Sequence, residues 1–583
     1  MTTNIQPTAM IFGEVVSSGV ARGPALVCAC AEHAAGPRWT ISETEAQKEM
    51  EKFDAAISEV EKDLLDLQKK VQQRVGKKEA EIFEMQILLL HDSSLREEVS
   101  TRCLTEKINV EAAVDEAIEK LTSLFVRLKD PYFRERAADL RDVGKRLLDI
   151  LTKSQSPGIS ILSDGSVIVT SELLPSVTAQ LDGQKIRGLV VEKGGQTAHA
   201  TILARALGIP LLIHVSDATK IIRTGDRLII DGLAGRVFIN PTPAILREYD
   251  RLEADLQAHQ TALKGLIELP AVTRDGVVIK LCANIGKSAD AVAAARLNAD
   301  GIGLYRTEFV FLVQDHFPSE EEQYEIYRIT ADRLKPREVV IRVLDIGSDK
   351  LLHYFPLPLE ANPSLGCRGT RLLLAHPEIL RAQLRAILRL SATHPVSILF
   401  PMVGGVEDLL AVKAAIESVK TSLALEHQPF NPRVPIGAMI ETPSAAILIG
   451  RLAQEVDFFS IGTNDLVQYL LTTDRTSNEV ASYYEPLHPA VLQVLASLAT
   501  AAKAKGKSIS VCGEMAGNPA YTQLLLGLGF RSLSVSPGEI LEIKNAIRST
   551  SLQQAEHLAR RLLQLDTIQE IKDCLRDEKT PKQ

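Results

Sequence analysis

Eight short apolar segments recur from about residue 269 onward, and a helical stretch separates each of them from the next. In chain order they read VVIKLCANI, GIGLYRTEF, VVIRVLDIGSD, VSILFPMV, VPIGAMIET, VDFFSIGTND, SISVCGE and RSLSVSP. Strands that alternate with helices in this way are typical of a (β/α)8 barrel, in which parallel strands close into a ring inside a layer of helices. We therefore predict a barrel of this type over residues 269–583.

Polar side chains stand where five of the eight predicted strands end. They are Arg306, Arg342, Asp345, Glu441, Asn464, Asp465, Cys512 and Glu514. Any one of them could be an ordinary solvated loop residue. The loops that follow barrel strands converge over one face of the barrel, however, and that face carries the chemistry of barrel enzymes. Agreement across several strands favours a site on this face.

These residue types suit an anionic ligand together with a divalent cation. Arg306 and Arg342 offer permanent charge and paired donors, which match the oxygens of phosphate and carboxylate groups. Glu441 and Asp465 add two hard oxygen ligands, and Mg²⁺ binds through one or two carboxylates together with substrate phosphate. The pattern predicts a site for a small phosphorylated carboxylic acid, with Mg²⁺ as the cofactor.

The residues before the barrel read as an α/β domain that a helical segment interrupts. β-like sequence covers residues 11–30 and returns after residue 160 as SVIVTSE, RGLVVEK, RLIIDG and RVFINP. Between Thr40 and Asp130 the chain has no proline and one glycine, which favours long helices. The predicted divisions are an α/β domain of residues 1–33 and 153–241, a helical insertion over 34–152 and a linker helix over 242–268.

One apolar stripe in the helical insertion repeats at spacings of four and three residues. It consists of Phe53, Ile57, Val60, Leu64, Leu67 and Val71. This is the spacing of one face of a helix, so the stripe predicts core between packed helices rather than a binding site.

A histidine lies at a position suited to phosphate chemistry in the stretch EKGGQTAHATILARALGIP, residues 192–210. The residues around it predict a strand, a tight turn at Gly194 and Gly195, and a helix from about residue 200 to 207. His199 would then stand at the helix N-terminus, where free N–H groups and the helix dipole attract anions. A residue that only caps the turn fits this stretch equally well.

Length and composition narrow the classes of protein to consider. A chain of 583 residues is too long for one core, so two to four domains are expected. The net charge of −8 and the lack of a membrane-length apolar run indicate neither a nucleic-acid partner nor membrane insertion. The seven cysteines show no paired spacing and the N-terminus shows no signal-peptide pattern, so we expect reduced thiols and a cytoplasmic location.

Several motifs resemble those of the Enzyme I family of the bacterial phosphotransferase system, the phosphoenolpyruvate-protein phosphotransferases. They are GGQTAHATILARALGIP, GIGLYRTEF, IETPSA, FFSIGTNDLVQY, the DR pair at 474–475, VCGEMAG and, in the helical insertion, RERAADLRDVGKRLL. The motifs occur in the family's order and the resemblance covers essentially the whole chain.

The resemblance implies a function and its partners. Phosphoenolpyruvate would bind at the barrel and phosphorylate His199 with release of pyruvate. An HPr-like phosphocarrier protein would receive the phosphoryl group next, as the first step of a phosphotransferase system. The same resemblance implies that the histidine-bearing α/β domain swivels and that the protein is a homodimer joined through its barrel domains.

The resemblance also implies roles for individual residues. Those that match the family's substrate site are Arg306, Arg342, Asn464, Asp465 and Arg475. Glu441 and Asp465 match the Mg²⁺ ligands, and Cys512 matches the acid that protonates the enolate carbon as pyruvate forms. Thr178 matches a threonine whose hydroxyl holds the imidazole tautomer, although a simple helix cap is the alternative for it.

A few positions depart from the family pattern. Ala198 stands where serine is usual, and Ser348 stands where a second glycine is usual. Gln86 replaces a common histidine, and Lys77 and Lys78 occupy a stretch that is often acidic. The last three changes bear on the identity of the carrier protein more than on the chemistry.

The helix that begins near Lys77 predicts a docking surface for the carrier. An apolar stripe with a polar rim is what a transient docking surface requires, and this helix carries Phe83, Met85, Gln86 and Leu89. Phe83 and Leu89 have an alternative as core of the insertion. Met85 and Gln86 are therefore the residues expected on the exposed face.

Two other interpretations of the chain stay open. An enzyme like pyruvate phosphate dikinase or phosphoenolpyruvate synthase would share the histidine domain and the barrel but needs an ATP-binding domain. The two near matches to a phosphate-binding loop, IGKS at 285–288 and KGKS at 505–508, lack its first glycine. A regulatory scaffold would bind without catalysis, which the intact set of predicted catalytic residues disfavours.

Overall fold

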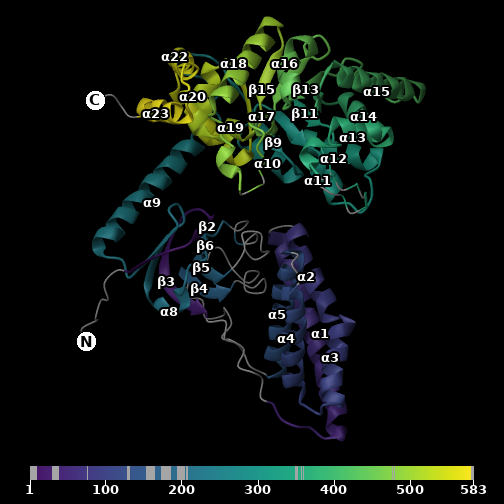
Figure 1. Cartoon of the computed structure of the whole chain (residues 1–583), viewed down its shortest axis with the longest axis vertical. Helices are drawn as coiled ribbons and strands as arrows, with labels where there is room; N and C mark the ends of the chain where they lie inside the picture. The colour runs from purple at the N-terminus through teal and green to yellow at the C-terminus, as the bar shows by residue number, and fades with distance from the viewer. Residues whose placement is uncertain are drawn as a thin grey trace. The chain divides into compact units, whose positions relative to one another are not determined.

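The computed structural model divides the chain into two compact units, residues 1–256 and 257–583. Figure 1 shows the helices and strands of each unit. The structure describes residues 9–28, 38–74, 77–127, 131–152, 165–172, 186–193, 204, 208–347, 352, 354–355, 357–358, 360–475, 477 and 479–579. Predicted turn and site positions that lie outside these residues are Thr178, Gly194, Gly195, Ala198, His199 and Ser348.

The second unit holds a closed barrel of eight strands. Its strands are β9 (Lys280–Ile285), β10 (Ile302–Arg306), β11 (Val339–Arg342), β12 (Val396–Phe400), β13 (Ile436–Ile440), β14 (Phe458–Ile461), β15 (Ser508–Val511) and β16 (Ser532–Val535). Each strand pairs in parallel with the next, and β16 returns to β9. The predicted (β/α)8 barrel is confirmed, since each of the eight apolar segments forms one of its strands.

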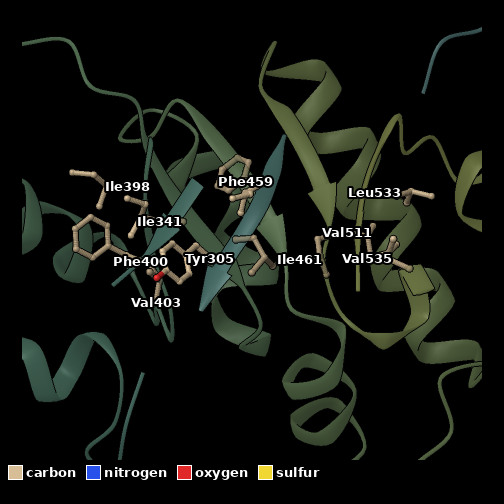
Figure 2. Close-up of a cluster of buried hydrophobic side chains, with 14 of the residues drawn as sticks. Tyr305, Ile341, Ile398, Phe400, Val403, Phe459, Ile461, Val511, Leu533 and Val535 are labelled. Atoms are coloured by element: carbon tan, nitrogen blue, oxygen red, sulfur yellow. The ribbon is translucent and has the colours of Figure 1, made fainter. Parts of the chain in front are cut away.

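Alternate residues of the barrel strands belong to two different apolar clusters. The larger cluster includes residues of the surrounding helices, and the strand residues in it that Figure 2 labels include Tyr305, Ile341, Ile398, Phe400, Phe459 and Ile461. The smaller cluster is formed by Leu304, Val340, Leu399, Met439 and Cys512. Because strand side chains alternate between faces, the first set faces the helices and the second faces the barrel interior.

Helices follow the barrel strands in the second unit. They are α10 (Ser288–Arg296), α11 (Glu308–Leu312), α12 (Glu320–Asp332), α13 (Thr370–Ala375), α14 (Pro377–Ser391), α15 (Val406–Leu425), α16 (Pro443–Leu452), α17 (Thr463–Leu470), α18 (Pro489–Ala504), α19 (Glu514–Gly517), α20 (Pro519–Gly527), α21 (Ile540–Ser549), α22 (Leu552–Leu562) and α23 (Ile568–Lys579). Their starts are fixed locally: at α16, Pro443 supplies the first residue and the Thr442 hydroxyl accepts the Ala445 N–H. This cap holds the turn that contains Glu441.

The first unit contains one eight-stranded sheet in the order β1-β8-β7-β3-β4-β5-β6-β2. The strands are β1 (Ala9–Phe12), β2 (Glu14–Ser17), β3 (Val20–Cys28), β4 (Ser166–Glu172), β5 (Ile186–Lys193), β6 (Leu211–Ile213), β7 (Arg227–Asp231) and β8 (Arg236–Ile239), and the short helix α8 (Ala218–Ile221) precedes β7. β3, β4, β5 and β6 run parallel, and the other pairs are antiparallel. β6 was not predicted, because three residues directly after a proline show no alternation.

In the described part of the chain between β3 and β4 there are five helices, as the proline-free segment predicts (Figure 1). They are α1 (Glu43–Arg74), α2 (Lys77–Leu90), α3 (Ser93–Leu104), α4 (Val110–Arg127) and α5 (Pro131–Leu151). The stripe from Phe53 to Val71 is buried in a core shared by these helices, so its prediction as packing core is confirmed. A further helix, α9 (Pro243–Lys264), connects the two units.

Gln86 is not an exposed docking residue, and that prediction is wrong. Phe83, Gln86 and Leu90 repeat at spacings of three and four and are all buried, so Gln86 occupies a core position of the α2 stripe. Its Nε2 donates to Asp142 Oδ2 of α5 at 3.0 Å, which satisfies the polar group inside the core. Phe83 is confirmed as core, while Met85 is half-buried.

None of the helices within the described ranges combines the length and the apolar character that crossing a lipid bilayer requires.

Candidate active site

Polar side chains from four strands meet at the carboxyl end of the barrel. Arg306 and Arg342 are the last residues of β10 and β11, Glu441 directly follows β13, and Cys512 directly follows β15. Because the strands run parallel, these ends open on the same face. The charges of Arg306, Arg342 and Glu441 all act on the Cys512 thiol, which places the four side chains near one another.

Arg342 is buried between two carboxylates. It forms ion pairs with Glu308 of α11 and, at 3.2 Å, with Asp345 Oδ2. Burial alone disfavours the charged guanidinium, but Glu308 and Asp345 outweigh that effect and raise the pKa of Arg342. The site therefore holds a permanent positive charge, and two carboxylates orient the guanidinium group that carries it.

Arg368 is a further charged residue beside Asp345, and it was not predicted from the sequence. It is buried, and its guanidinium lies 3.0 Å from Asp345 Oδ2 and 3.8 Å from Asp465 Oδ1. Arg475 approaches the same Asp465 oxygen at 3.6 Å. Arg368 lies in the turn SLGCRGT before α13 rather than at the end of a strand, so the strand-end pattern could not identify it. Ion pairs thus connect the ends of β11 and β14 through this turn.

Glu441 and Asp465 form the acidic part of the site. Glu441 is fully buried, and its Oε1 accepts the Met402 N–H at 2.6 Å. Burial, followed by the nearby carboxylates of Asp465 and Asp345, raises the pKa of Glu441. Glu441 Oε2 and Asp465 Oδ1 are buried oxygens without a hydrogen-bond donor. A buried acceptor without a donor is unfavourable. The guanidinium groups of Arg368 and Arg475 already lie near Asp465 Oδ1, and a cation bound to both carboxylates would also satisfy Glu441 Oε2.

The residues present therefore fit a Mg²⁺ ion that takes its remaining ligands from outside the protein. Within the described ranges, no group of three or more His, Cys, Asp or Glu side chains could hold a metal by itself. A pair of carboxylates is a common Mg²⁺ arrangement when water and substrate phosphate complete the octahedron.

Cys512 is a buried, protonated thiol. Its Sγ donates to the Ile461 carbonyl at 3.2 Å and accepts from the Ser460 hydroxyl at 3.1 Å. Burial raises the pKa of Cys512 to about 11, while the Ser460 hydroxyl and the positive charges of Arg306 and Arg342 act in the opposite direction. The thiol keeps its proton at neutral pH and faces the barrel interior, where it can donate that proton to a reacting carbon.

Asn464 is held in one orientation at the start of α17. Its Nδ2 donates to Glu514 Oε1 at 2.7 Å, and its Oδ1 accepts the Glu514 N–H at 2.8 Å. The turn between Cys512 and Glu514 packs against it so closely that a Cβ on Gly513 would lie 1.9 Å from Thr463 Oγ1. Glycine is required there by crowding, because its φ of −78° is open to any residue.

The nucleophile predicted from the sequence follows β5. His199 and Thr178 lie outside the described residues, so the structure places neither of them. β5 ends at Lys193, at the carboxyl edge of the parallel strands β3 to β6. In open α/β sheets, ligands bind outside the carboxyl ends of parallel strands. The segment that carries His199 therefore begins at the edge of the sheet where such sites occur.

Comparison with known protein families identifies three matching regions. The family described as "PEP-utilising enzyme, N-terminal" matches residues 13–136. The one described as "PEP-utilising enzyme, mobile domain" matches residues 162–235, and "PEP-utilising enzyme, PEP-binding domain" matches residues 260–552. The matches follow one another along the chain, and the last of them contains the barrel and its polar face.

Two relatives match over more than nine-tenths of the chain, and one solved structure matches over less than half of it. An NMR solution structure of Enzyme I (nEIt) covers 42% of this chain and 99% of its own, at 31% identity and a TM-score of 0.37. The phosphoenolpyruvate-protein phosphotransferase of Haemophilus influenzae is 38% identical over 97% of this chain and 99% of its own length. That of Bacillus subtilis is 37% identical over 91% of this chain and 93% of its own. The chain therefore belongs to the family of phosphoenolpyruvate-protein phosphotransferases.

Proposed function

We propose that this protein transfers the phosphoryl group of phosphoenolpyruvate to His199, releases pyruvate, and passes the group on to a histidine of an HPr-like phosphocarrier protein. This is the first step of a phosphotransferase system. The observation that carries the proposal is the buried Arg342, held by ion pairs with Glu308 and Asp345, near the buried carboxylate of Glu441, whose Oε2 has no hydrogen-bond donor.

The arginines bind the substrate's two anionic groups. Arg306 lies exposed at the end of β10, and Arg342 is held beside it by Glu308 and Asp345. Arg475 approaches from beyond α17. Paired guanidinium donors match the oxygens of phosphate and carboxylate, and they neutralise the charge that spreads over the phosphoryl oxygens in the transition state. Asn464 contributes an amide already fixed by Glu514.

Glu441 and Asp465 would hold the Mg²⁺ ion. A bound Mg²⁺ supplies further neutralisation of phosphate charge. Glu441 is fixed for this role because its Oε1 is held by the Met402 N–H, while its Oε2 has no donor.

Cys512 supplies the proton that the reaction requires. The P–O bond of phosphoenolpyruvate breaks as a bond forms between phosphorus and an imidazole nitrogen of His199, which leaves the enolate of pyruvate. Cys512 gives its S–H proton to C3 of that enolate and becomes a thiolate. The Ser460 hydroxyl donates to the sulfur at 3.1 Å and stabilises the negative charge formed there.

The nucleophile and the substrate site belong to different units of the chain. We assign residues 1–33 and 153–241 to the phosphohistidine domain, 34–152 to the carrier-binding insertion, 242–268 to the linker helix and 269–583 to the substrate-binding barrel. His199 must reach both the barrel and the carrier, so the phosphohistidine domain swivels between them, with Thr178 holding the imidazole tautomer. The proposal includes a cytoplasmic location and a homodimer joined through the barrels.

The experiment is incubation of the purified chain with phosphoenolpyruvate labelled at phosphorus, with and without Mg²⁺. We expect one labelled group per chain, labile to acid and stable to base, on a peptide that contains His199 and absent from His199→Ala. A requirement for ATP would instead indicate a dikinase-like enzyme. Binding of phosphoenolpyruvate without any label transfer would indicate a regulatory scaffold.

Carrier specificity is tested in a second step. The labelled protein is mixed with HPr-like proteins from the same genome, and transfer of label to a carrier histidine is followed by rapid quench. Stable retention of the label on His199 with every such carrier would refute the second half of the proposal.

A further inference from the structure

A buried chain of hydrogen bonds connects helices α12 and α14 to the ends of strands β10 and β11. At its centre is Gln383 of α14. Its Oε1 accepts the Leu344 N–H at 2.9 Å, and its Nε2 donates to Thr307 Oγ1 at 3.1 Å and to the Tyr327 hydroxyl at 3.0 Å. All four residues are at most 1% exposed, so water cannot replace these bonds.

Only one arrangement of hydrogens satisfies this chain. The Leu344 N–H can only donate, which makes Gln383 Oε1 the acceptor and leaves the Nε2 group as the donor. The Thr307 hydroxyl receives one of these bonds and donates to the Arg342 carbonyl at 2.9 Å. The orientation of the Gln383 amide is therefore fixed by the backbone groups that it reaches, and each bond strengthens the next.

The other branch of the chain leads away from the barrel strands. The Tyr327 hydroxyl receives the second Gln383 bond and donates to Gln323 Oε1 at 3.1 Å, and Gln323 Nε2 donates to the Pro318 carbonyl at 2.8 Å. Gln323 is buried as fully as Gln383 and makes two side-chain hydrogen bonds in the same chain. It touches neither β10 nor β11 through them, which makes it a natural control.

The first branch ends on the two turns that carry charged residues of the candidate site. Thr307 directly follows Arg306 and precedes Glu308, and Leu344 directly precedes Asp345. Strands β10 and β11 pair Tyr305 with Ile341 and Arg306 with Arg342 at their carboxyl ends, and the ladder stops there, before the two turns begin. Gln383 contacts both ends at once, through one hydroxyl and one backbone amide.

We propose that Gln383 is a positioning residue for phosphoryl transfer: it sets the spacing between the turn of Arg306 and Glu308 and the turn of Arg342 and Asp345. The inference rests on the proposed function. Gln383 does not reach the mouth of the barrel itself. It acts through Thr307 and the Leu344 amide, and so holds the guanidinium groups where the transferring phosphoryl group is neutralised.

The test compares Gln383→Leu with Gln323→Leu. Each replaces a buried glutamine by an apolar residue of similar size, and each removes side-chain bonds from the same network. For both variants, rapid quench measures single-turnover phosphorylation by phosphoenolpyruvate over a range of substrate concentrations. The unfolding temperature of the protein and the amide exchange of the 340–347 peptide are measured on the same samples. Thr307→Val, which cuts the link to the Arg342 carbonyl, provides a second variant should Gln383→Leu fold poorly.

We expect Gln383→Leu to lower the maximal phosphorylation rate at least tenfold with a change in KM of less than about threefold, because small misplacements of catalytic groups affect the transition state most. Thr307→Val should act in the same direction. Gln323→Leu should stay within about twofold of the parent at a similar loss of unfolding temperature. Amide exchange of the 340–347 peptide should rise in Gln383→Leu only.

Equal loss of rate in Gln383→Leu and Gln323→Leu, or an unchanged rate in Gln383→Leu, would overturn the positioning role while leaving the proposed function intact. Failure of the parent protein to accept phosphate from phosphoenolpyruvate would instead overturn the proposed function. The two failures are therefore distinguished by the parent reaction alone.

Discussion

Ion pairs orient individual side chains at the carboxyl end of the barrel. Arg342 has a carboxylate on either side, so its guanidinium is oriented before any ligand binds. Orientation of donors in advance is the largest contribution that a protein makes to stabilising charge in a transition state. Arg306, by contrast, is exposed at the end of its strand.

We predict that Arg342→Ala slows phosphorylation of His199 by a hundredfold or more, since one oriented donor is worth about 3 kcal/mol. Arg342→Lys should recover little of the rate, because an ammonium group does not reproduce the planar, bidentate donors of a guanidinium. Rapid-quench kinetics measure both variants. A lysine variant with nearly normal rate would contradict the assignment.

Buried thiols give the barrel a pH dependence of stability. Burial raises the pKa of Cys282 to about 12, well above its value in an unfolded chain. Between about pH 9 and pH 12 the native state holds a proton that the unfolded state has lost, so the free energy of unfolding falls as pH rises, by up to about 1.4 kcal/mol per pH unit. This stabilising contribution is complete below the unfolded pKa.

We predict that Cys282→Ala loses less stability than the parent protein when the pH rises from about 8.5 to about 10.5. The free energy of unfolding is measured at several pH values by urea unfolding followed by circular dichroism. The other buried thiols and the tyrosines titrate alike in both proteins, so the difference between the two slopes isolates Cys282. Parallel slopes would show that this thiol is reached by solvent.

At the scale of elements, the buried face of α2 includes a residue that was predicted on its exposed face, Gln86. Phe83, Gln86 and Leu90 point into the helical core, whereas Leu88 is 63% exposed. Docking of another protein on this face of α2 would bury the Leu88 side chain. The docking hypothesis for the insertion therefore moves from Gln86 to Leu88.

We predict that Leu88→Glu leaves phosphorylation of His199 within about twofold and slows onward transfer to the carrier at least tenfold, about 1.4 kcal/mol. Leu104→Glu is the matched control, because Leu104 is another exposed leucine of the insertion, at the end of α3. Rapid quench resolves the two steps. Equal effects of both substitutions on onward transfer would place the docking surface elsewhere.

Elements with strong periodicity could be predicted from the sequence, and tertiary contacts could not. All eight barrel strands were found because each is a buried apolar run between helices. Their parallel ends also brought most predicted site residues to one face. Arg368 and Gln383 were missed because a turn and a helix interior carry no strand-end signal, and Gln86 was misplaced because a polar residue can occupy a core position once Asp142 pairs with it.

At the scale of the whole molecule, the predicted nucleophile His199 belongs to one compact unit and the proposed substrate site belongs to the other. We predict that His199→Ala abolishes phosphorylation while its affinity for phosphoenolpyruvate stays within about threefold of the parent, about 0.7 kcal/mol. Calorimetry measures the affinity and label incorporation measures the reaction. Loss of binding in this variant would contradict the separation of the two sites.

Position 513 accepts no residue other than glycine, which restricts the sequence variation of this turn. Any side chain there would collide with Thr463 and disturb Asn464, although the backbone angles would accept every amino acid. In a randomised library selected for phosphotransfer, this position should return glycine alone. Cys512, the proposed acid, thus lies beside a position without mutational tolerance, and its acidity has to be adjusted from the neighbouring strand β14, through residues such as Ser460.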